Sequence, residues 1–282
     1  MDFSRDIYEN RIKKGAPFLV AHRGVSTANI PCNTLAAFEI AMNQGADVIE
    51  IDITKSKDGE FFVFHPNMER VYLKCGKKIP EMTAEEVRST LLLNQDEAVT
   101  HYRIPTLQDT FSLLKDRVYI NVDKFWTDIP GITEQIRKAG VEKQVIVKTP
   151  LKEIYLAQME EYAPDLMFCA LASHKDEISA ELLKRRIHYI GVEALFDKDT
   201  DEIVSNSHIR WLHKQRLLIW ANAIIYDEAA NIAAGHTDDI SMTDDPEKGW
   251  GWMLKKEIDF IQTDWILPLR LYLEKKSMMW RD

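Results

Sequence analysis

The chain has 282 residues and a mass of 32.7 kDa, with 45% apolar and 29% charged residues. These proportions are close to the globular average and exclude disordered and fibrous classes. Its 36 basic and 45 acidic residues give a formal charge of −9. This charge argues against binding to nucleic acid or an anionic membrane, which both require a cationic surface. A small anion remains a compatible ligand if a few cations converge in one pocket.

No apolar run approaches the roughly 18 residues of a membrane span. The longest such run, residues 217–226, is interrupted by Asn222. The first twenty residues carry many charges and no apolar core, which does not fit a secretory signal. The three cysteines occur at no metal-ligand spacing. We therefore expect a cytoplasmic protein without integral membrane association, and we make no prediction of its oligomeric state.

Short β-rich runs alternate with helical patterns along the whole chain. Most of these runs are nearly continuous in apolar or β-branched residues, which is typical of parallel strands buried on both faces. The eight expected strands are 18–22, 47–53, 118–124, 144–148, 166–171, 187–193, 217–223 and 258–263.

Helix signals occupy the segments between the strands. Thr34 is placed to cap a helix that Gly45 ends, and Thr83 with Glu86 forms a capping-box pattern. Thr106 starts another helix in the same way. Further helical stretches are 130–139, 151–161, 175–186, 199–215 and 247–257. This alternation predicts a single (β/α)8 TIM-barrel domain over residues 1–282.

Two segments interrupt the alternation. Residues 56–66 contain an Asp58-Gly59 turn and predict a short extra strand after strand two. Residues 226–246 form a long polar loop after strand seven, which we expect to be a lid.

Titratable side chains gather at the carboxyl ends of the expected strands, where barrel enzymes carry their active sites. Glu50 and Asp52 are two residues apart on strand two and therefore share a face. Asp123 stands at the same end of strand three. Three carboxylates predict an all-oxygen site for one hard divalent cation.

Histidines and cations flank this carboxylate group. His22 and His65 end strand one and the extra strand, where they can exchange a proton near neutral pH. Arg23 and Lys148 are placed to neutralise an anionic substrate. Together these groups suit the cleavage of a phosphodiester, because cations offset the developing charge while a histidine protonates the leaving oxygen.

The order of these motifs resembles the glycerophosphodiester phosphodiesterase family. The resemblance covers almost the whole chain and is most specific in residues 22–65. It is carried by His22-Arg23-Gly24, Pro31-Cys32-Asn33-Thr34, residues 45–52, Lys57-Asp58-Gly59, Val63-Phe64-His65, residues 104–107, Asn121 with Asp123, Trp220-Ala221-Asn222 and residues 261–264.

The resemblance implies a TIM barrel that hydrolyses a small glycerophosphodiester to glycerol phosphate and an alcohol with Ca²⁺ or Mg²⁺. It implies His22 and His65 as the general acid and base, Arg23 as a phosphate ligand, and Glu50 and Asp52 as metal ligands. The family's usual route, in which a neighbouring substrate hydroxyl attacks the phosphate and water then opens the cyclic product, would carry over. A role in lipid and glycerol metabolism would follow.

The sequence departs from the family pattern around this site. Cys32 and Pro66 replace acidic residues, Asp123 replaces a longer glutamate, and Phe125 replaces a lysine. In a regular strand Lys124 would lie on the opposite face. We therefore infer that Lys148 supplies the missing positive charge to the substrate, although a salt bridge at the barrel rim is an equally good interpretation of this residue.

Trp220 and Asn222 share one face of strand seven and are expected to contact the substrate, although barrel packing is an equally good interpretation of both. Two other functions remain open at this point. One is a lyase that releases a stable cyclic phosphate, and the other is a non-catalytic barrel that binds a phosphorylated ligand. The altered residues at positions 32, 66 and 125 motivate the second alternative.

Overall fold

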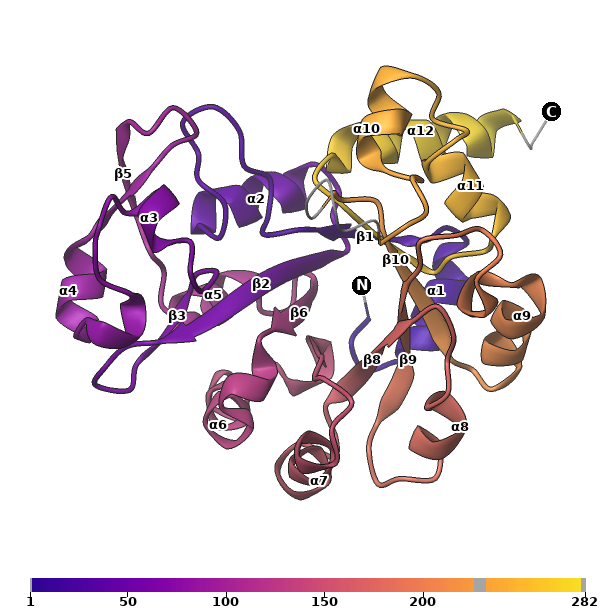
Figure 1. Cartoon of the computed structure of the whole chain (residues 1–282), viewed down its shortest axis with the longest axis horizontal. Coiled ribbons are helices and arrows are strands. Elements are labelled where there is room, and N and C mark those ends of the chain that lie inside the picture. Colours follow the sequence, from indigo (N-terminus) through magenta and orange to yellow (C-terminus); the bar gives the residue numbers. More distant parts are fainter. Residues whose placement is uncertain (1, 226–231, 280–282) are drawn as a thin grey trace.

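The structure is a computed structural model and describes residues 2–225 and 232–279. Within the described chain, eight parallel strands close into a barrel, as the sequence predicts (Figure 1). The ring closes because β1 pairs with both β2 and β11. In order around the barrel the strands are β1 (Phe18–Ala21), β2 (Val48–Lys55), β6 (Tyr119–Asp123), β7 (Val145–Val147), β8 (Met167–Ser173), β9 (Tyr189–Leu195), β10 (Leu218–Asn222) and β11 (Phe260–Thr263).

Helices surround the barrel, and several begin at the caps expected from the sequence (Figure 1). The Thr34 and Thr106 side chains accept hydrogen bonds from Ala37 N–H and Asp109 N–H. The outer helices are α2 (Leu35–Asn43), α5 (Leu107–Leu114), α6 (Ile129–Ala139), α7 (Glu153–Tyr162), α8 (Ser179–Leu182), α9 (Asn206–Lys214), α11 (Trp250–Lys255) and α12 (Ile266–Met279). Short 3₁₀ turns are η1 (Ile79–Glu81), η2 (Phe125–Thr127), η3 (Glu142–Gln144) and η4 (Glu202–Val204).

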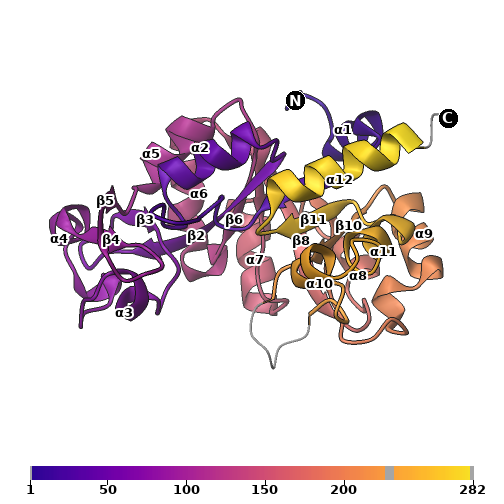
Figure 2. The ribbon, with the colours of Figure 1, turned by 90° about the horizontal axis from the view of Figure 1, so that it is seen from above.

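A small lobe projects from the end of β2 (Figure 2). The expected extra strand is β3 (Phe61–Val63), which pairs antiparallel with β2. It is followed by α3 (Glu69–Tyr72), α4 (Ala84–Ser89) and a hairpin of β4 (Leu91–Leu93) and β5 (Val99–Arg103). This lobe has an apolar core of its own, which includes Phe62, Leu73, Ile79 and Val87. The lobe therefore packs around its own core beside the carboxyl end of the barrel.

Apolar side chains fill the interior of the barrel toward the amino ends of its strands. The interior cluster is Ile7, Phe18, Val20, Val48, Tyr119, Ile146, Met167, Cys169, Ile190, Leu218, Trp220 and Phe260. Such a plug is usual for this architecture and leaves only the carboxyl end of the barrel available for polar chemistry. The opposite end is covered by α1 (Ile7–Lys14), whose Asn10 amide donates to the Tyr119 hydroxyl.

Several elements differ from the sequence expectations. The helix expected over 175–186 is only the short α8, and the one expected over 199–215 starts seven residues late, at Asn206. Helices α1 and α12 and the β4–β5 hairpin were not predicted. The residue types that cap α1 are typical helix signals in the sequence. Asp6 accepts from Tyr8 N–H at its start, and Gly15 is left-handed with φ 68° at its end.

The segment after β10 is anchored to the barrel along its described part. Residues 226–231 of the expected lid lie outside the described residues. The rest contains α10 (Asp238–Thr243), and Ala233 forms a bridge to Phe196. Residues 232–246 therefore form part of the packed wall rather than a free lid.

Of the helices in the described ranges, none is both long enough and apolar enough to cross a bilayer.

Candidate active site at the carboxyl end of the barrel

Three carboxylates meet where β2 and β6 end. Glu50 and Asp52 point to one face of β2, and the parallel register places Asp52 directly beside Asp123 of β6. Their ligand oxygens all lie within 4.8 Å of one another. Glu50 and Asp52 are almost fully buried, at 4% and 1% exposure. The structure thus brings together the three residues that the sequence predicts as metal ligands.

The three carboxylates place like charges close together in a buried position. Burial, followed by the charge of Asp52, raises the pKa of Glu50 to about 8. Asp52 Oδ1 is buried and finds no hydrogen-bond partner among the residues that the structure describes. Buried oxygen ligands that repel one another suit a hard divalent cation. The residues present therefore fit the metal that the sequence implies.

His22 extends from β1 and is held by Asp264. Its Nδ1 lies 2.9 Å from Asp264 Oδ1. Burial alone would lower the pKa of His22, but the hydrogen bond to Asp264 and the charge of Glu50 outweigh it and raise this pKa. The role of Asp264 was missed, although it belongs to a motif that carries the family resemblance and stands directly after β11.

His65 approaches the cluster from the other side, at the end of the extra strand. Its Nδ1 lies 2.9 Å from the Pro66 carbonyl oxygen, which can only accept, so Nδ1 carries the proton. Its Nε2 lies 3.9 Å from Asp52 Oδ1. Burial lowers the pKa of His65, and the charges of Arg23 and Lys124 add to this effect against that of Asp52. A neutral ring in this tautomer offers Nε2 as a proton acceptor.

Arg23 spans the two β2 carboxylates. Its backbone N–H donates to Glu50 Oε2 at 3.0 Å, and its Nε lies 2.9 Å from Asp52 Oδ2. Arg23 adopts φ 58°, and Gly24 follows at φ 80°. A Cβ on Gly24 would lie 2.8 Å from the Ala37 carbonyl carbon, so the tight turn requires glycine here. Asn33 completes the cluster by donating from Nδ2 to Asp52 Oδ2 at 2.9 Å.

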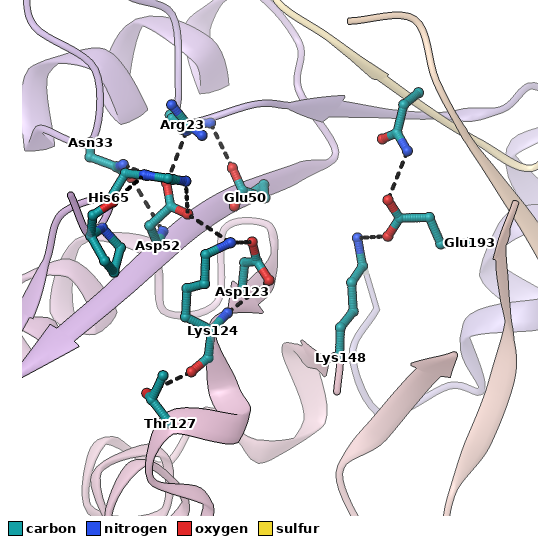
Figure 3. Close-up of polar contacts among 12 residues, drawn as sticks. Arg23, Asn33, Glu50, Asp52, His65, Asp123, Lys124, Thr127, Lys148 and Glu193 are labelled. Atoms are coloured by element: carbon teal, nitrogen blue, oxygen red, sulfur yellow. Dashed lines mark hydrogen bonds and ion pairs between the residues drawn. The ribbon is translucent and has the colours of Figure 1, made fainter. Parts of the chain in front are cut away.

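Lys124 lies in the site, contrary to the expectation that it faces away. Strand β6 ends at Asp123, and Lys124 is left-handed with φ 61°, so strand alternation does not apply to it. Its ammonium pairs with Asp123 and lies 3.8 Å from Asp52 Oδ1 (Figure 3). Although burial opposes ionisation, Lys124 lowers the pKa of Asp123. The positive charge missing at Phe125 is thus present one residue earlier.

Lys148 and Asn222 lie deeper in the barrel and meet at Glu193. The Lys148 ammonium pairs with Glu193 (Figure 3), and Asn222 Nδ2 donates to Glu193 Oε1 at 2.7 Å. Burial opposes the charge of Lys148, but Glu193 outweighs it and raises the pKa of the ammonium. The pair gives Lys148 a fixed position, so it is not a free substitute for the family's lysine.

Trp220 lies in the apolar plug and lines neither cavity beside the carboxylate cluster. Its side chain is fully buried, stacks on Phe260 at 4.9 Å between ring centroids, and carries the Lys148 ammonium 3.7 Å above its ring. It therefore supports the site from below as part of the apolar plug. Packing, which was the alternative interpretation, accounts for its position.

Two adjoining cavities share His22 and Arg23. The inner one, about 260 Å³, is lined by the carboxylates Glu50 and Asp123 and by Lys148. The outer one, about 640 Å³, extends past Trp265. A larger cavity of about 890 Å³ lies beside α1 at the other end of the barrel, and neither His22 nor His65 lines it.

A family model described as the glycerophosphoryl diester phosphodiesterase family matches residues 22–218, well over half of the chain. The chain belongs to this family. A second model, described as a domain of unknown function, matches residues 167–273. The second match overlaps the family match at β8 to β10 and continues beyond it.

Relatives in the family align mainly over part of their length. The chain is 33% identical over 156 residues to a glycerophosphodiester phosphodiesterase of Caldanaerobacter subterraneus subsp. tengcongensis, which covers 52% of this chain and 63% of that relative. It is 30% identical over 143 residues to a glycerophosphodiester phosphodiesterase of Bacillus altitudinis, covering 46% of this chain and 57% of that relative. Both matches span less than two thirds of the relative.

Solved structures in the family share the fold over nearly the whole chain. A glycerophosphoryl diester phosphodiesterase from Parabacteroides distasonis superposes with a TM-score of 0.76 and 20% identity, covering 92% of this chain and 86% of that chain. An Oleispira antarctica phosphodiesterase, solved with the product sn-glycerol-3-phosphate, gives a TM-score of 0.63 and 17% identity, covering 93% and 98%. These likenesses confirm the barrel.

Asp238 of α10 holds the loop that carries Asp264. It accepts hydrogen bonds from Trp250 Nε1, the Thr263 hydroxyl and Asp264 N–H. Burial raises the pKa of Asp238 to about 6, and these three bonds oppose that effect.

Replacing Asp238 with alanine leaves two buried donors and one half-buried donor unpaired and is expected to lower the free energy of unfolding by about 2–4 kcal/mol. Urea denaturation measures this change. Asp239→Ala, at the exposed neighbouring position, is the matched control and is expected to change stability little. Equal stability of both variants would contradict the anchoring role.

Proposed function

We propose that this protein is a metal-dependent phosphodiesterase that cleaves glycerophosphodiesters, or a related small phosphodiester, to glycerol phosphate and an alcohol. The observation that carries the proposal is the placement of His22 and His65 in one cavity with the carboxylate cluster and Arg23. Glu50, Asp52 and Asp123 would hold one divalent cation. A cation of this class, when bound, supplies positive charge that stabilises the charge developing on the phosphate.

The remaining steps are assigned to side chains of the chain itself. His65, with Nε2 free to accept, would take the proton from the attacking hydroxyl. His22, whose opposite nitrogen is fixed by Asp264, would donate a proton to the leaving oxygen. Water would then open the cyclic phosphate, with His22 taking a proton from the water and His65 returning one to the substrate hydroxyl. The raised pKa of His22 and the lowered pKa of His65 favour this division, because they keep an acid and a base available together. Arg23 and Lys124 would neutralise the phosphate.

The experiment is hydrolysis of glycerophosphocholine, glycerophosphoethanolamine and glycerophosphoglycerol, each with Ca²⁺, Mg²⁺ or Mn²⁺ and each with a chelator. Released glycerol phosphate is the readout. The proposal expects release that requires a cation and stops with the chelator. Release of glycerol phosphate that is undiminished by the chelator would contradict the metal site. The absence of release from all three substrates with every cation would contradict the activity. A cytoplasmic location and a role in lipid and glycerol metabolism remain predictions of this proposal.

A further inference from the structure

A ring of polar side chains lies across the barrel directly above the apolar plug. Its members come from separate strands and all line the inner cavity; they are Asn121 of β6, Lys148 after β7, Glu193 of β9, Asn222 of β10 and Gln262 of β11. Each is at most 6% exposed. We call this set the polar floor. Buried polar groups cost stability unless they are paired, so a floor of this kind calls for a functional account.

Charge pairs and hydrogen bonds fix the direction of two floor amides. Glu193 forms an ion pair with the Lys148 ammonium (Figure 3) and accepts a hydrogen bond from Asn222 Nδ2. Asn121 Nδ2 donates to the Ile146 carbonyl at 3.2 Å. Because the NH₂ group of each asparagine is engaged, its carbonyl oxygen is the atom left for a ligand.

Three acceptors of the floor are unpaired. Within residues 2–225 and 232–279, Asn121 Oδ1, Asn222 Oδ1 and Gln262 Oε1 are buried and have no hydrogen-bond partner. Leaving a buried acceptor unpaired costs about 1–3 kcal/mol. All three belong to residues that line one cavity, so one ligand with several donors would satisfy them together.

The charges around the cavity select the kind of donor. Lys148 and Lys124 line it and already pair with the cavity carboxylates Glu193 and Asp123, so a ligand ammonium near the floor would compete with two fixed cations for these partners. Neutral hydroxyl groups donate equally well to amide oxygens without this competition. The volume of about 260 Å³ is below the range of drug-sized sites and suits a short polyol. The alcohol half of a diester would occupy the outer cavity of about 640 Å³. His22 and Arg23 line both cavities, at the point where they adjoin.

We infer that the polar floor is a hydroxyl-recognising subsite, in which Asn121, Asn222 and Gln262 accept hydrogen bonds from the short polyol half of the substrate. Glu193 and Lys148 are positioning residues that hold Asn222. The inference rests on the proposed function, since it places the two halves of a phosphodiester on either side of His22 and Arg23. The polyol half lies in the inner cavity, and the alcohol half lies in the outer cavity. It identifies as determinants of substrate choice Gln262, which belongs to a motif of the family resemblance but received no role from the sequence, and Glu193, which the sequence did not indicate.

The test is calorimetric binding of three phosphate monoesters of similar size in the presence of Mg²⁺. They are sn-glycerol 3-phosphate, n-propyl phosphate and phosphoethanolamine. Glycerol phosphate is expected to bind at least about tenfold more tightly than either of the others, since one or more neutral hydrogen bonds distinguish it. In Gln262→Met, which keeps the shape but removes the acceptor, the preference is expected to fall to about threefold or less. Gln108→Met, at the contact of α5 with Gln135 of α6 and outside both cavities, is the matched control.

The outcomes separate this inference from the proposed function. Equal wild-type binding of glycerol phosphate and propyl phosphate would overturn the inference, whether or not the Gln262 variant folds. Tighter binding of phosphoethanolamine would also overturn it. Failure of every diester to be hydrolysed, with the hydroxyl preference intact, would contradict the proposed function and leave the subsite in place.

Discussion

Replacing His22 or His65 with alanine is expected to lower kcat by about a hundredfold to ten-thousandfold on any diester that the wild-type protein cleaves. Each variant removes one member of the acid–base pair while the carboxylates and Arg23 stay in place. Binding of a divalent cation, measured by its effect on Tm, is expected to remain. Steady-state kinetics on purified variants checks the size of the loss.

The control for these variants is His188→Ala. His188 is exposed, precedes β9 at the opposite end of the barrel, and bonds the Asp165 carbonyl. Its replacement is expected to leave kcat unchanged. Turnover within about threefold of wild type in His65→Ala would contradict its role as the base, because positioned bases contribute far more than this. The same result in His22→Ala would contradict its role as the acid.

Replacing Glu50 with glutamine is expected to stabilise the metal-free protein and to abolish its response to metal. The folded state raises the pKa of Glu50 to about 8 from 4.5, so folding at neutral pH requires proton uptake. For a raised pKa, the contribution to stability falls as pH rises from about 5 to 8. Removing the charge is therefore expected to add about 1–3 kcal/mol to the free energy of unfolding at pH 8 in a chelator.

Asp123→Asn is the matched variant with the opposite expected sign. Lys124 lowers the pKa of Asp123, so its carboxylate stabilises the metal-free fold and its loss leaves Lys124 without that partner. Denaturation of both variants, with a chelator and with Mg²⁺, measures whether the free energy of unfolding rises in Glu50→Gln and falls in Asp123→Asn. A metal-induced rise in Tm that persists in Glu50→Gln would contradict the assignment of Glu50 as a ligand. Equal destabilisation by both variants would contradict the charge argument.

The barrel and the carboxylates could be predicted from the sequence because local patterns determine them. Continuous apolar runs indicate parallel strands, and the spacing of two residues puts Glu50 and Asp52 on one face. The extra strand was also predictable, since the Asp58-Gly59 turn precedes β3. The β4–β5 hairpin gave no such signal, because β4 has only three residues and β5 only five.

The remaining features of the site depend on geometry that no local pattern specifies. Lys124 enters the site because its backbone leaves the strand in a left-handed conformation. Trp220 and Asn222 share a face of β10, yet one lies in the apolar plug and the other in the polar floor, since the barrel stacks inward residues in layers. Glu193 reaches Lys148 from a strand two positions away around the ring, a pairing that depends on the order of the strands in the sheet.

The most direct test of the central claim is phosphorus NMR of glycerophosphoethanolamine incubated with the protein and Mg²⁺, beside the same sample with a chelator and with His65→Ala. The account predicts that the diester resonance is replaced by a phosphomonoester resonance only in the wild-type sample with cation. A cyclic phosphate that accumulates as the final product would indicate a lyase. A diester resonance that persists in the wild-type sample, while Mg²⁺ raises its Tm, would contradict phosphodiester cleavage at this site.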